Sequence, residues 1–198
     1  ALRQYGLAEK YFEKVLAVDP NNSLVLKQYE KTLIARRSKL LGSQKEGAQA
    51  KLESKLEKLQ RVKERINRSV DELIRQAEDQ AFNVGNFLAA EKLYRAALKI
   101  DPNHPETKSS YARMIHIQAT DAIEAKNFVR AESLLTEALK LKPEDATLNT
   151  DYGQFSRKRG EEALDRNEFV EAARRFEICL EHTPEDQAAL LGFAIALL

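Results

Sequence analysis

Residues 126–143 read KNFVRAESLLTEALKLKP, and similar segments lie 41 residues earlier, at 85–102, and 41 residues later, at 167–184. Each segment ends in a proline, as do residues 5–20. The prolines of this pattern are Pro20, Pro102, Pro143 and Pro184, separated by 82, 41 and 41 residues. Self-similarity at a fixed period of about 20–50 residues is typical of a repeat protein, whose units stack because none buries its apolar face alone.

Apolar side chains recur in every segment at steps of three and four residues, which places them on one stripe of an α-helix. In residues 126–143 the stripe consists of Phe128, Ala131, Leu135, Ala138 and Leu139. The equivalent residues elsewhere are Phe87, Ala90, Tyr94, Ala97 and Leu98; Phe169, Ala172, Phe176, Cys179 and Leu180; and Tyr5, Ala8, Phe12, Val15 and Leu16. The proline ends this helix because it lacks an amide proton and its ring crowds the preceding turn. Polar residues after the proline can cap a following helix, so each repeat is a pair of helices.

An alanine, an aromatic residue eight positions before a proline and a small residue between them resemble the second helix of a tetratricopeptide repeat. Gly85 and Gly160 resemble two glycines of that family. The resemblance covers three second helices between residues 81 and 183 and a fourth at residues 1–20. The usual period of the family is about 34 residues, and seven additional residues, almost two helical turns, lengthen the first helix here. The tryptophan of the family's first helix is absent, since the chain has no Trp.

The sequence therefore predicts an all-α fold, an α-solenoid of antiparallel helix pairs with one long heptad-patterned helix. The chain has only 7 Gly and 5 Pro, and no segment alternates apolar and polar residues as a strand would. We expect a repeat fragment and the helix after it in residues 1–43, a long charged helix in 44–84, and repeats in 85–198, all in one continuous array. Because residues 1–20 resemble a second helix without its first, we expect the chain to be part of a longer protein.

The repeat pattern weakens between Pro20 and Pro102, where a charge-rich segment from about residue 48 to 82 lacks proline and has no glycine. Its apolar residues follow heptad spacing: Leu52, Leu56, Leu59, Ile66, Val70, Leu73 and Ala77. One interpretation is a helix that packs back against the helix of residues 23–41 in the same chain. The other is an intermolecular coiled coil that forms a homodimer.

No arrangement of residues indicates catalysis. His104, His116 and His182 lie in three different repeat contexts without a second ligand at metal-binding spacing, and no phosphate-binding loop or nucleophile motif occurs. We therefore predict no enzyme activity, no cofactor and no metal. Cys179 falls at the small position of its helix stripe, which predicts a buried structural thiol.

The chain has 32 Lys and Arg against 31 Asp and Glu, a net charge of +1. This balance argues against nucleic acid as a partner, because phosphate binding needs a local excess of positive charge. No run of about 18 apolar residues is present, so we expect no membrane insertion within these residues. The apolar residues 188–198 have three explanations: a first helix whose covering helix lies outside this sequence, a contact with another copy, or the start of a membrane segment. The compartment is not indicated.

The resemblance implies a non-catalytic scaffold or adaptor that binds a protein or peptide partner in a concave groove lined by the first helices. These helices would cover about residues 64–84, 106–126 and 147–167. The groove candidates are Arg75, Asn83, Arg113, His116, Gln154, Arg157 and Lys158.

Arg75, His116 and Arg157 are equivalent in the 41-residue register, and arginine forks bind carboxylates well, so an acidic partner segment is the preferred ligand. The alternative is a solvated charged face, in which Asp79 and Glu161 pair with the arginines four residues before them. Asp79, Thr120 and Glu161 stand where chaperone-binding members of the family would have asparagine, which disfavours that role. The competing function is a structural element that self-associates through the heptad helix.

Overall fold

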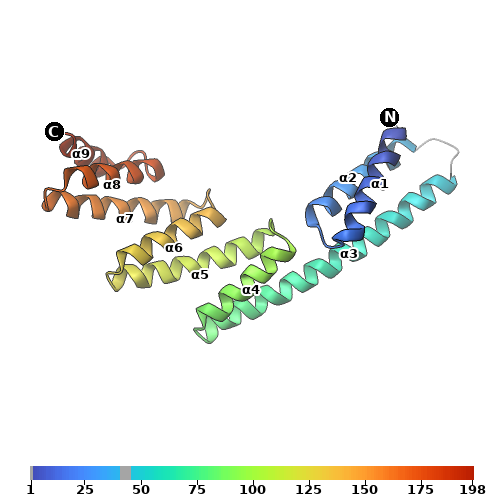
Figure 1. The fold of residues 1–198 in the computed structure, drawn as a ribbon, viewed down its shortest axis with the longest axis horizontal. Helices are drawn as coiled ribbons and strands as arrows, with labels where there is room; N and C mark the ends of the chain where they lie inside the picture. Colours follow the sequence, from blue (N-terminus) through green and yellow to red (C-terminus); the bar gives the residue numbers. More distant parts are fainter. Residues whose placement is uncertain (1, 41–45) are drawn as a thin grey trace. The chain divides into compact units, whose positions relative to one another are not determined.

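The computed structural model describes residues 2–40 and 46–198, and these residues form helices and turns with no strand among them (Figure 1). The prediction of an all-α fold of helix pairs is confirmed. The chain divides into two compact units, Ala1–Thr107 (unit 1) and Lys108–Leu198 (unit 2). Unit 1 contains α1 (Leu2–Val18), α2 (Ser23–Leu40), α3 (Glu46–Glu78), the π-helical turn η1 (Asp79–Asn83) and α4 (Phe87–Ile100). Unit 2 contains most of α5 (Pro105–Glu124), then α6 (Phe128–Leu141), α7 (Ala146–Asp165), α8 (Phe169–His182) and α9 (Gln187–Ala196).

Four helices end two residues before a proline of the repeat pattern. Helices α1, α4, α6 and α8 end at Val18, Ile100, Leu141 and His182. After two of these prolines, an aspartate caps the next helix, because its carboxylate accepts amide protons that have no partner inside the helix. Asp145 accepts from Thr147 and Leu148 at 3.1 and 3.2 Å, and Asp186 accepts from Ala189 at 2.9 Å. The predicted helix ends and caps are therefore confirmed at these turns.

The turn before the second helix of a repeat has the same unusual backbone in three copies. The φ angle is +75° at Gly85, +57° at Lys126 and +57° at Asn167, three positions that are 41 residues apart. This left-handed region suits glycine and is tolerated by asparagine, whereas a lysine adopts it at a steric cost. The residue that follows caps the second helix through its side chain at Asn86 and Asn127.

In unit 1 the long helix α3 packs against two neighbours. Figure 1 shows α2 beside the first part of α3 and α4 beside its last part. The buried residues of α2 are Leu26, Tyr29, Leu33 and Leu40, and those of α3 include Leu52, Leu59, Ile66, Val70, Ile74 and Ala77. Five of the seven predicted seam residues are therefore buried within one chain, as the intramolecular interpretation predicted, while Leu56 and Leu73 are half-buried.

A charged network joins the first three helices of unit 1. Glu9 of α1 is only 3% exposed and pairs with Arg36 of α2 and, at 2.9 Å, with the ammonium of Lys55 of α3. Lys55 also contacts the carboxylate of Glu13 at 2.8 Å, and the hydroxyl of Tyr29 donates to Glu13 at 2.7 Å. Burial, together with this hydrogen bond, raises the pKa of Tyr29 to about 12. The network supplies the buried Glu9 carboxylate with the cations it needs.

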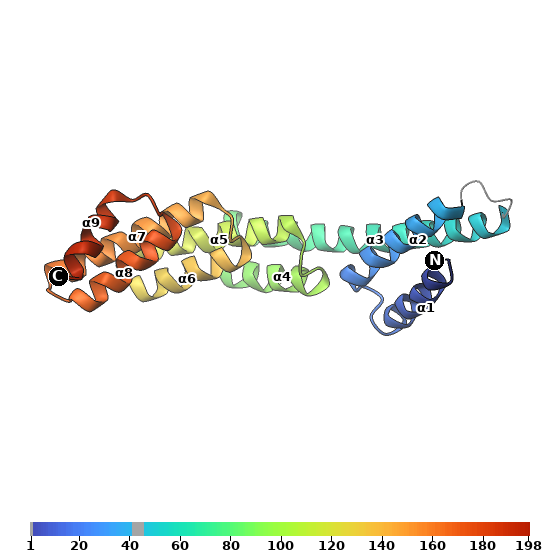
Figure 2. The same ribbon diagram turned by 90° about the horizontal axis from the view of Figure 1, so that it is seen from above.

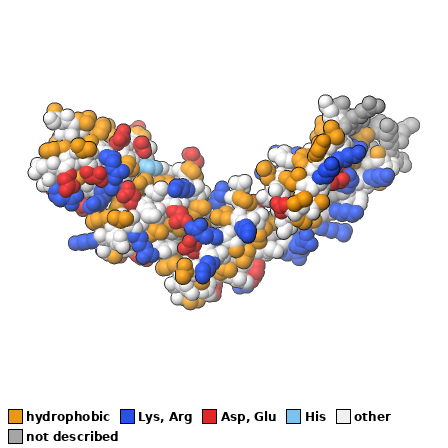
Figure 3. Space-filling model, in the orientation of Figure 1, with side chains coloured by type: hydrophobic (Ala, Val, Ile, Leu, Met, Phe, Trp, Pro, Cys, Tyr) orange, Lys and Arg blue, Asp and Glu red, His pale blue; other side chains and the backbone are white. Residues whose placement is uncertain are grey.

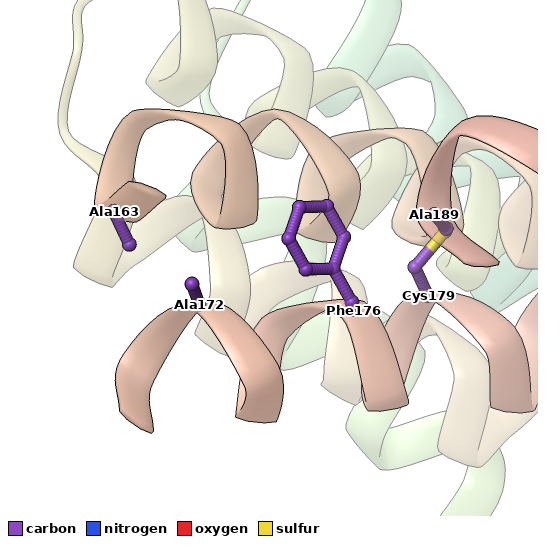
Figure 4. Packing of buried hydrophobic residues seen from close by; sticks show 5 residues of the cluster. All are labelled: Ala163, Ala172, Phe176, Cys179 and Ala189. Atoms are coloured by element: carbon purple, nitrogen blue, oxygen red, sulfur yellow. The ribbon is translucent and has the colours of Figure 1, made fainter. Parts of the chain in front are cut away.

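In unit 2 the second helices bury the small residues of their stripes. Figure 2 shows α7, α8 and α9 next to one another. Figure 4 shows a cluster formed by Ala163 of α7, Ala172, Phe176 and Cys179 of α8, and Ala189 of α9. All five are fully buried, and burial raises the pKa of the Cys179 thiol. Cys179 is thus the buried thiol that its position predicted.

Gly160 of α7 allows α8 to approach closely. A Cβ atom at Gly160 would lie 2.9 Å from two ring carbons of Phe176, a separation that real Cβ atoms essentially never show. Gly192 of α9 faces the same ring, where a Cβ would come within 2.4 Å. The phenyl ring therefore occupies the space that side chains at these two positions would need.

The predicted divisions at residues 43 and 84 remain predictions, although two findings bear on them. Helix α3 is continuous from Glu46 to Glu78 and passes directly into η1, while residues 44 and 45 lie outside the described residues. The division into two compact units falls between residues 107 and 108, near the start of α5.

Candidate functional site

Unit 2 contains a pocket of about 240 Å³ between α5, α6 and α7. Its apolar walls are formed by Ile123, Phe128, Leu135 and Phe155. Its polar lining consists of His116, Thr120, Asp151, Gln154, Lys158, Arg159 and Glu162. An apolar interior with a few polar groups around it is the usual composition of a binding pocket.

The repeat turn positions one aromatic wall of the pocket. Lys126 takes the left-handed conformation and Asn127 caps α6, so Phe128 becomes the first residue of that helix. Its ring centroid lies 6.3 Å from that of Phe155 on α7. The guanidinium carbon of Arg159 lies 4.4 Å from the centre of the Phe128 ring, an arrangement in which a cation is attracted to the ring face.

Two side chains of the pocket already contact carboxylates, and one cation does not. Nε2 of His116 lies 2.8 Å from a carboxylate oxygen of Asp151, and Arg159 pairs with Glu162. Lys158 is exposed and forms no ion pair with any described carboxylate. An incoming carboxylate would therefore meet an ammonium group that forms no ion pair with the described carboxylates.

The structure brings together three of the seven groove candidates, since His116, Gln154 and Lys158 all line the pocket. Arg157 lies on α7, as Gln154 and Lys158 do, but its side chain does not line the pocket. Its guanidinium is 2.6 Å from the carboxylate of Glu161, the pairing that the alternative interpretation predicted, and its Nε is 3.2 Å from that of Asp186.

The remaining candidates do not join this pocket. Arg75 and Asn83 belong to unit 1, where Arg75 pairs with Glu72 at 2.6 Å and the amide of Asn83 donates to Asp79 at 2.9 Å. Asp79 therefore accepts a hydrogen bond from Asn83, and Arg75 pairs with Glu72 and not with Asp79. Arg113 is exposed on α5 and is not among the lining residues.

Sequence reasoning missed several residues of the pocket. Phe128 was identified only as part of a helix stripe, and Phe155, Asp151 and Arg159 were not identified. Of these four residues, only Phe128 has a feature in the sequence that could have indicated it, namely its equivalent position in each repeat. Asp151 acquires its role from His116 on another helix, and such pairing leaves no mark in a single sequence.

The histidines and acids do not form a metal site, because the described residues contain no group of three or more potential ligands. Nδ1 of His182 lies 2.7 Å from the side-chain oxygen of Asn149, its ring packs 4.8 Å from that of Tyr152, and burial lowers its pKa. His104 contacts Thr107 at the start of α5. Within the described residues, no helix is both long and apolar enough to span a bilayer.

The stacked helix pairs define a helical-repeat protein. The sequence profile of the tetratricopeptide repeat matches residues 1–22, which include α1 and its proline turn, and residues 81–104, which include α4. The two matched segments are therefore similar to tetratricopeptide repeats, and the resemblance seen in the sequence is confirmed at these second helices. Proteins of this class typically serve as scaffolds for protein interactions.

No curated protein matches the sequence. Among solved structures, a monomeric mutant of IFIT1 with m7Gppp-AAAA is 19% identical, with a TM-score of 0.30, covering 98% of this chain and 43% of that one. A human IFIT1 dimer with m7Gppp-AAAA is also 19% identical, with a TM-score of 0.30 and coverages of 97% and 42%. A human IFIT1 dimer with PPP-AAAA is 21% identical, with a TM-score of 0.27 and coverages of 100% and 42%. The chain spans less than half of these IFIT1 chains, and such TM-scores do not support transferring any property of IFIT1 to it.

Proposed function

We propose that the chain is a non-catalytic interaction module that binds a partner polypeptide through the pocket between α5, α6 and α7. The observation that carries this proposal is an aromatic cavity, formed by Phe128 and Phe155, beside Lys158, which no described carboxylate pairs with. Its volume of about 240 Å³ is below the range of about 300–1,000 Å³ usual for small-molecule sites. A single large side chain of a bound polypeptide is an occupant of suitable size.

The charges around the pocket specify what should accompany that side chain. His116 and Arg159 already have carboxylate partners, whereas Lys158 has none among the residues that the structure describes. A partner with an apolar or aromatic anchor and a neighbouring Asp or Glu would fill the cavity and pair with Lys158. The acidic ligand expected from the sequence is thus retained, with Lys158 replacing Arg75 and Arg157 as its main contact.

The proposal can be tested by selecting binders to the full chain from a random peptide library displayed on phage. We expect the selected peptides to share a large apolar residue close to an Asp or Glu. Thr120→Trp should block the cavity without removing a core side chain, because Thr120 is exposed at the pocket. Peptide affinity should then fall at least about tenfold, the effect of losing roughly 1.4 kcal/mol.

Thr150→Trp is the matched control, since Thr150 is exposed on α7 outside the pocket. It should leave peptide affinity unchanged. In contrast, Lys158→Glu should weaken peptides that contain the acidic residue more than variants in which that residue is neutral. Peptides that bind wild type and Thr120→Trp equally well, or a library that yields no binders, would contradict the proposal.

The alternative function, self-association through the heptad helix, receives no comparable support. The seam residues Leu52, Leu59 and Ile66 are buried within unit 1 against neighbouring helices. A second copy is not needed to cover them.

A further inference from the structure

The net charge of +1 conceals a strong division of charge along the chain. Residues 1–70 contain 16 Lys and Arg against 8 Asp and Glu, a net charge of +8. Residues 71–198 contain 16 Lys and Arg against 23 Asp and Glu, a net charge of −7. The positive part comprises α1, α2 and most of α3, so the expectation drawn from the whole-chain charge does not apply to this region.

The positive charge is most ordered on α3. Figure 3 shows Lys and Arg side chains gathered over the first part of this helix. Five exposed basic residues follow one another at steps of seven, three, four and three residues, which keeps them on one face. This basic stripe consists of Lys51, Lys58, Arg61, Arg65 and Arg68. At 1.5 Å per residue it extends over about 25 Å of straight helix.

The stripe differs from the other charged surfaces because internal carboxylates do not neutralise it. Every arginine of α4, α7 and α8 is paired with a carboxylate: Arg95, Arg157, Arg159, Arg174 and Arg175. No stripe residue forms an ion pair with a described carboxylate; Arg68 donates only to the backbone oxygen of Glu64, at 3.4 Å.

The nearest acids on α3 lie beside the stripe. Glu53, Glu57 and Glu64 fall roughly 90° around the helix from its centre, at 100° per residue. Lys55, on the opposite edge of the stripe, is already held by Glu9 and Glu13, and Arg75, farther along α3, pairs with Glu72. The stripe is therefore a continuous cationic surface bordered on one flank by acids.

The composition of this surface indicates the kind of partner. The residues between the cations on this face, such as Ser54 and Ser69, are polar, and the large apolar residues of α3 are on its opposite, packed side. Protein interfaces usually need buried aromatic or aliphatic anchors, and peripheral membrane binding by a helix needs apolar groups to insert. Backbone binding to nucleic acid needs neither, because phosphate neutralisation and counterion release supply most of its free energy.

We propose that the basic stripe of α3 binds the phosphate backbone of nucleic acid without sequence preference. The five side chains lie along one line, and three are arginines, whose guanidinium forks hold phosphate oxygens in pairs. This site lies in unit 1 and is separate from the pocket of unit 2, so either site can fail its test without affecting the other.

The salt dependence follows from the number of contacts. If all five cations contact phosphates of a duplex, log K should fall with log salt at a slope of about −4.5. The triple variant K58A/R61A/R65A removes three contacts and should reduce that slope to about −1.8. At about 0.1 M salt, each phosphate contact raises the binding constant roughly eightfold relative to 1 M salt. The variant lacks three such contacts and should therefore bind roughly 500-fold more weakly than wild type.

Fluorescence anisotropy with the full chain can measure these values, using labelled duplex DNA, duplex RNA and single-stranded RNA as probes. The three probes show which form of the backbone the stripe prefers. The matched control is K10A/K27A/K31A, which removes three exposed lysines from α1 and α2 and changes the net charge equally. Circular dichroism should show that both variants remain helical, because every substituted residue is exposed.

We expect the stripe variant to lose both affinity and salt slope while the control keeps most of each. No binding of wild type at low salt would overturn the proposal, as would equal losses in the two variants, because net charge alone would then explain the result. Tighter binding to poly-glutamate, or to vesicles containing phosphatidylserine, than to nucleic acid at the same salt would assign the stripe to a different partner.

Discussion

The contact between Gly160 and Phe176 gives the most specific stability prediction. Phe176 is fully buried in the α7–α8–α9 cluster, and a Cβ at position 160 would lie 2.9 Å from its ring. Ordinary contacts begin near 3.4 Å, so Gly160→Ala forces a displacement of about 0.5 Å in a packed core. The preceding repeat has the opposite pair, Ala119 with Leu135, where the smaller partner leaves room for the methyl group.

Two opposing effects determine how much Gly160→Ala changes the free energy of unfolding. Overpacking a core costs about 1–3 kcal/mol, whereas replacing glycine by alanine inside a helix stabilises it by about 0.5–1 kcal/mol. We therefore expect Gly160→Ala to lower the free energy of unfolding by about 1 kcal/mol. Gly6→Ala is the matched control, because Gly6 is inside α1 and a Cβ there would meet nothing within 4 Å. That variant should raise the free energy of unfolding by about 0.5–1 kcal/mol.

The assay is urea unfolding followed by circular dichroism, with a double-mutant cycle. Gly160→Ala combined with Phe176→Leu reproduces the residue pair of the preceding repeat and should relieve the overlap. The double variant should therefore be less destabilised than the sum of the two single variants, with a coupling of about 1 kcal/mol. If Gly160→Ala stabilises the protein as much as Gly6→Ala, or if the two substitutions are additive, the steric argument is wrong.

Three further predictions concern the turns and ion pairs. Lys126→Gly should raise the free energy of unfolding by about 0.5–1 kcal/mol in urea titrations, because glycine adopts the φ of +57° without steric cost. Glu171 has its pKa lowered to about 2 by hydrogen bonds from Arg174 and Arg175, against an ordinary value of 4.5. Its stabilising effect should thus be complete above about pH 4.5 and disappear as the pH falls towards 2, so the stability difference between wild type and Glu171→Gln should shrink over that interval. Glu9→Gln should lower the free energy of unfolding by about 2 kcal/mol, because Lys55 and Arg36 lose a buried anion, and thermal unfolding should show an earlier transition.

Part of the site could be predicted and part could not. His116, predicted from the repeat register, and Gln154 and Lys158, predicted as groove candidates on a first helix, do line one pocket. Arg157 was predicted by the same register, but Glu161 and Asp186 occupy its guanidinium. Glu161 could be foreseen as a partner because it follows Arg157 by four residues on α7. Asp186 could not, because it caps a different helix, α9.

The uneven distribution of charge along the chain shows a second reason why a site can be missed in a sequence. It is fully present in the sequence, yet a whole-chain total of +1 hides it, because the excess in residues 1–70 cancels the deficit in 71–198. The basic stripe required one further fact from the structure, namely which cations of α3 have carboxylate partners. Lys55 and Lys63 form ion pairs with acids of other helices, while Lys51 and Lys58 form none with any acid that the structure describes.

The sequence by itself determined the helices, their ends and the repeat of 41 residues. These features depend on interactions within a few residues: side chains spaced three and four apart share a helix face, and a proline stops the helix two residues before it. The tertiary structure alone decided that the seam of α3 is buried within one chain, that three helices enclose the pocket, and which charges are neutralised. Those outcomes depend on side chains from separate helices meeting in space, and local spacing does not specify where such helices meet.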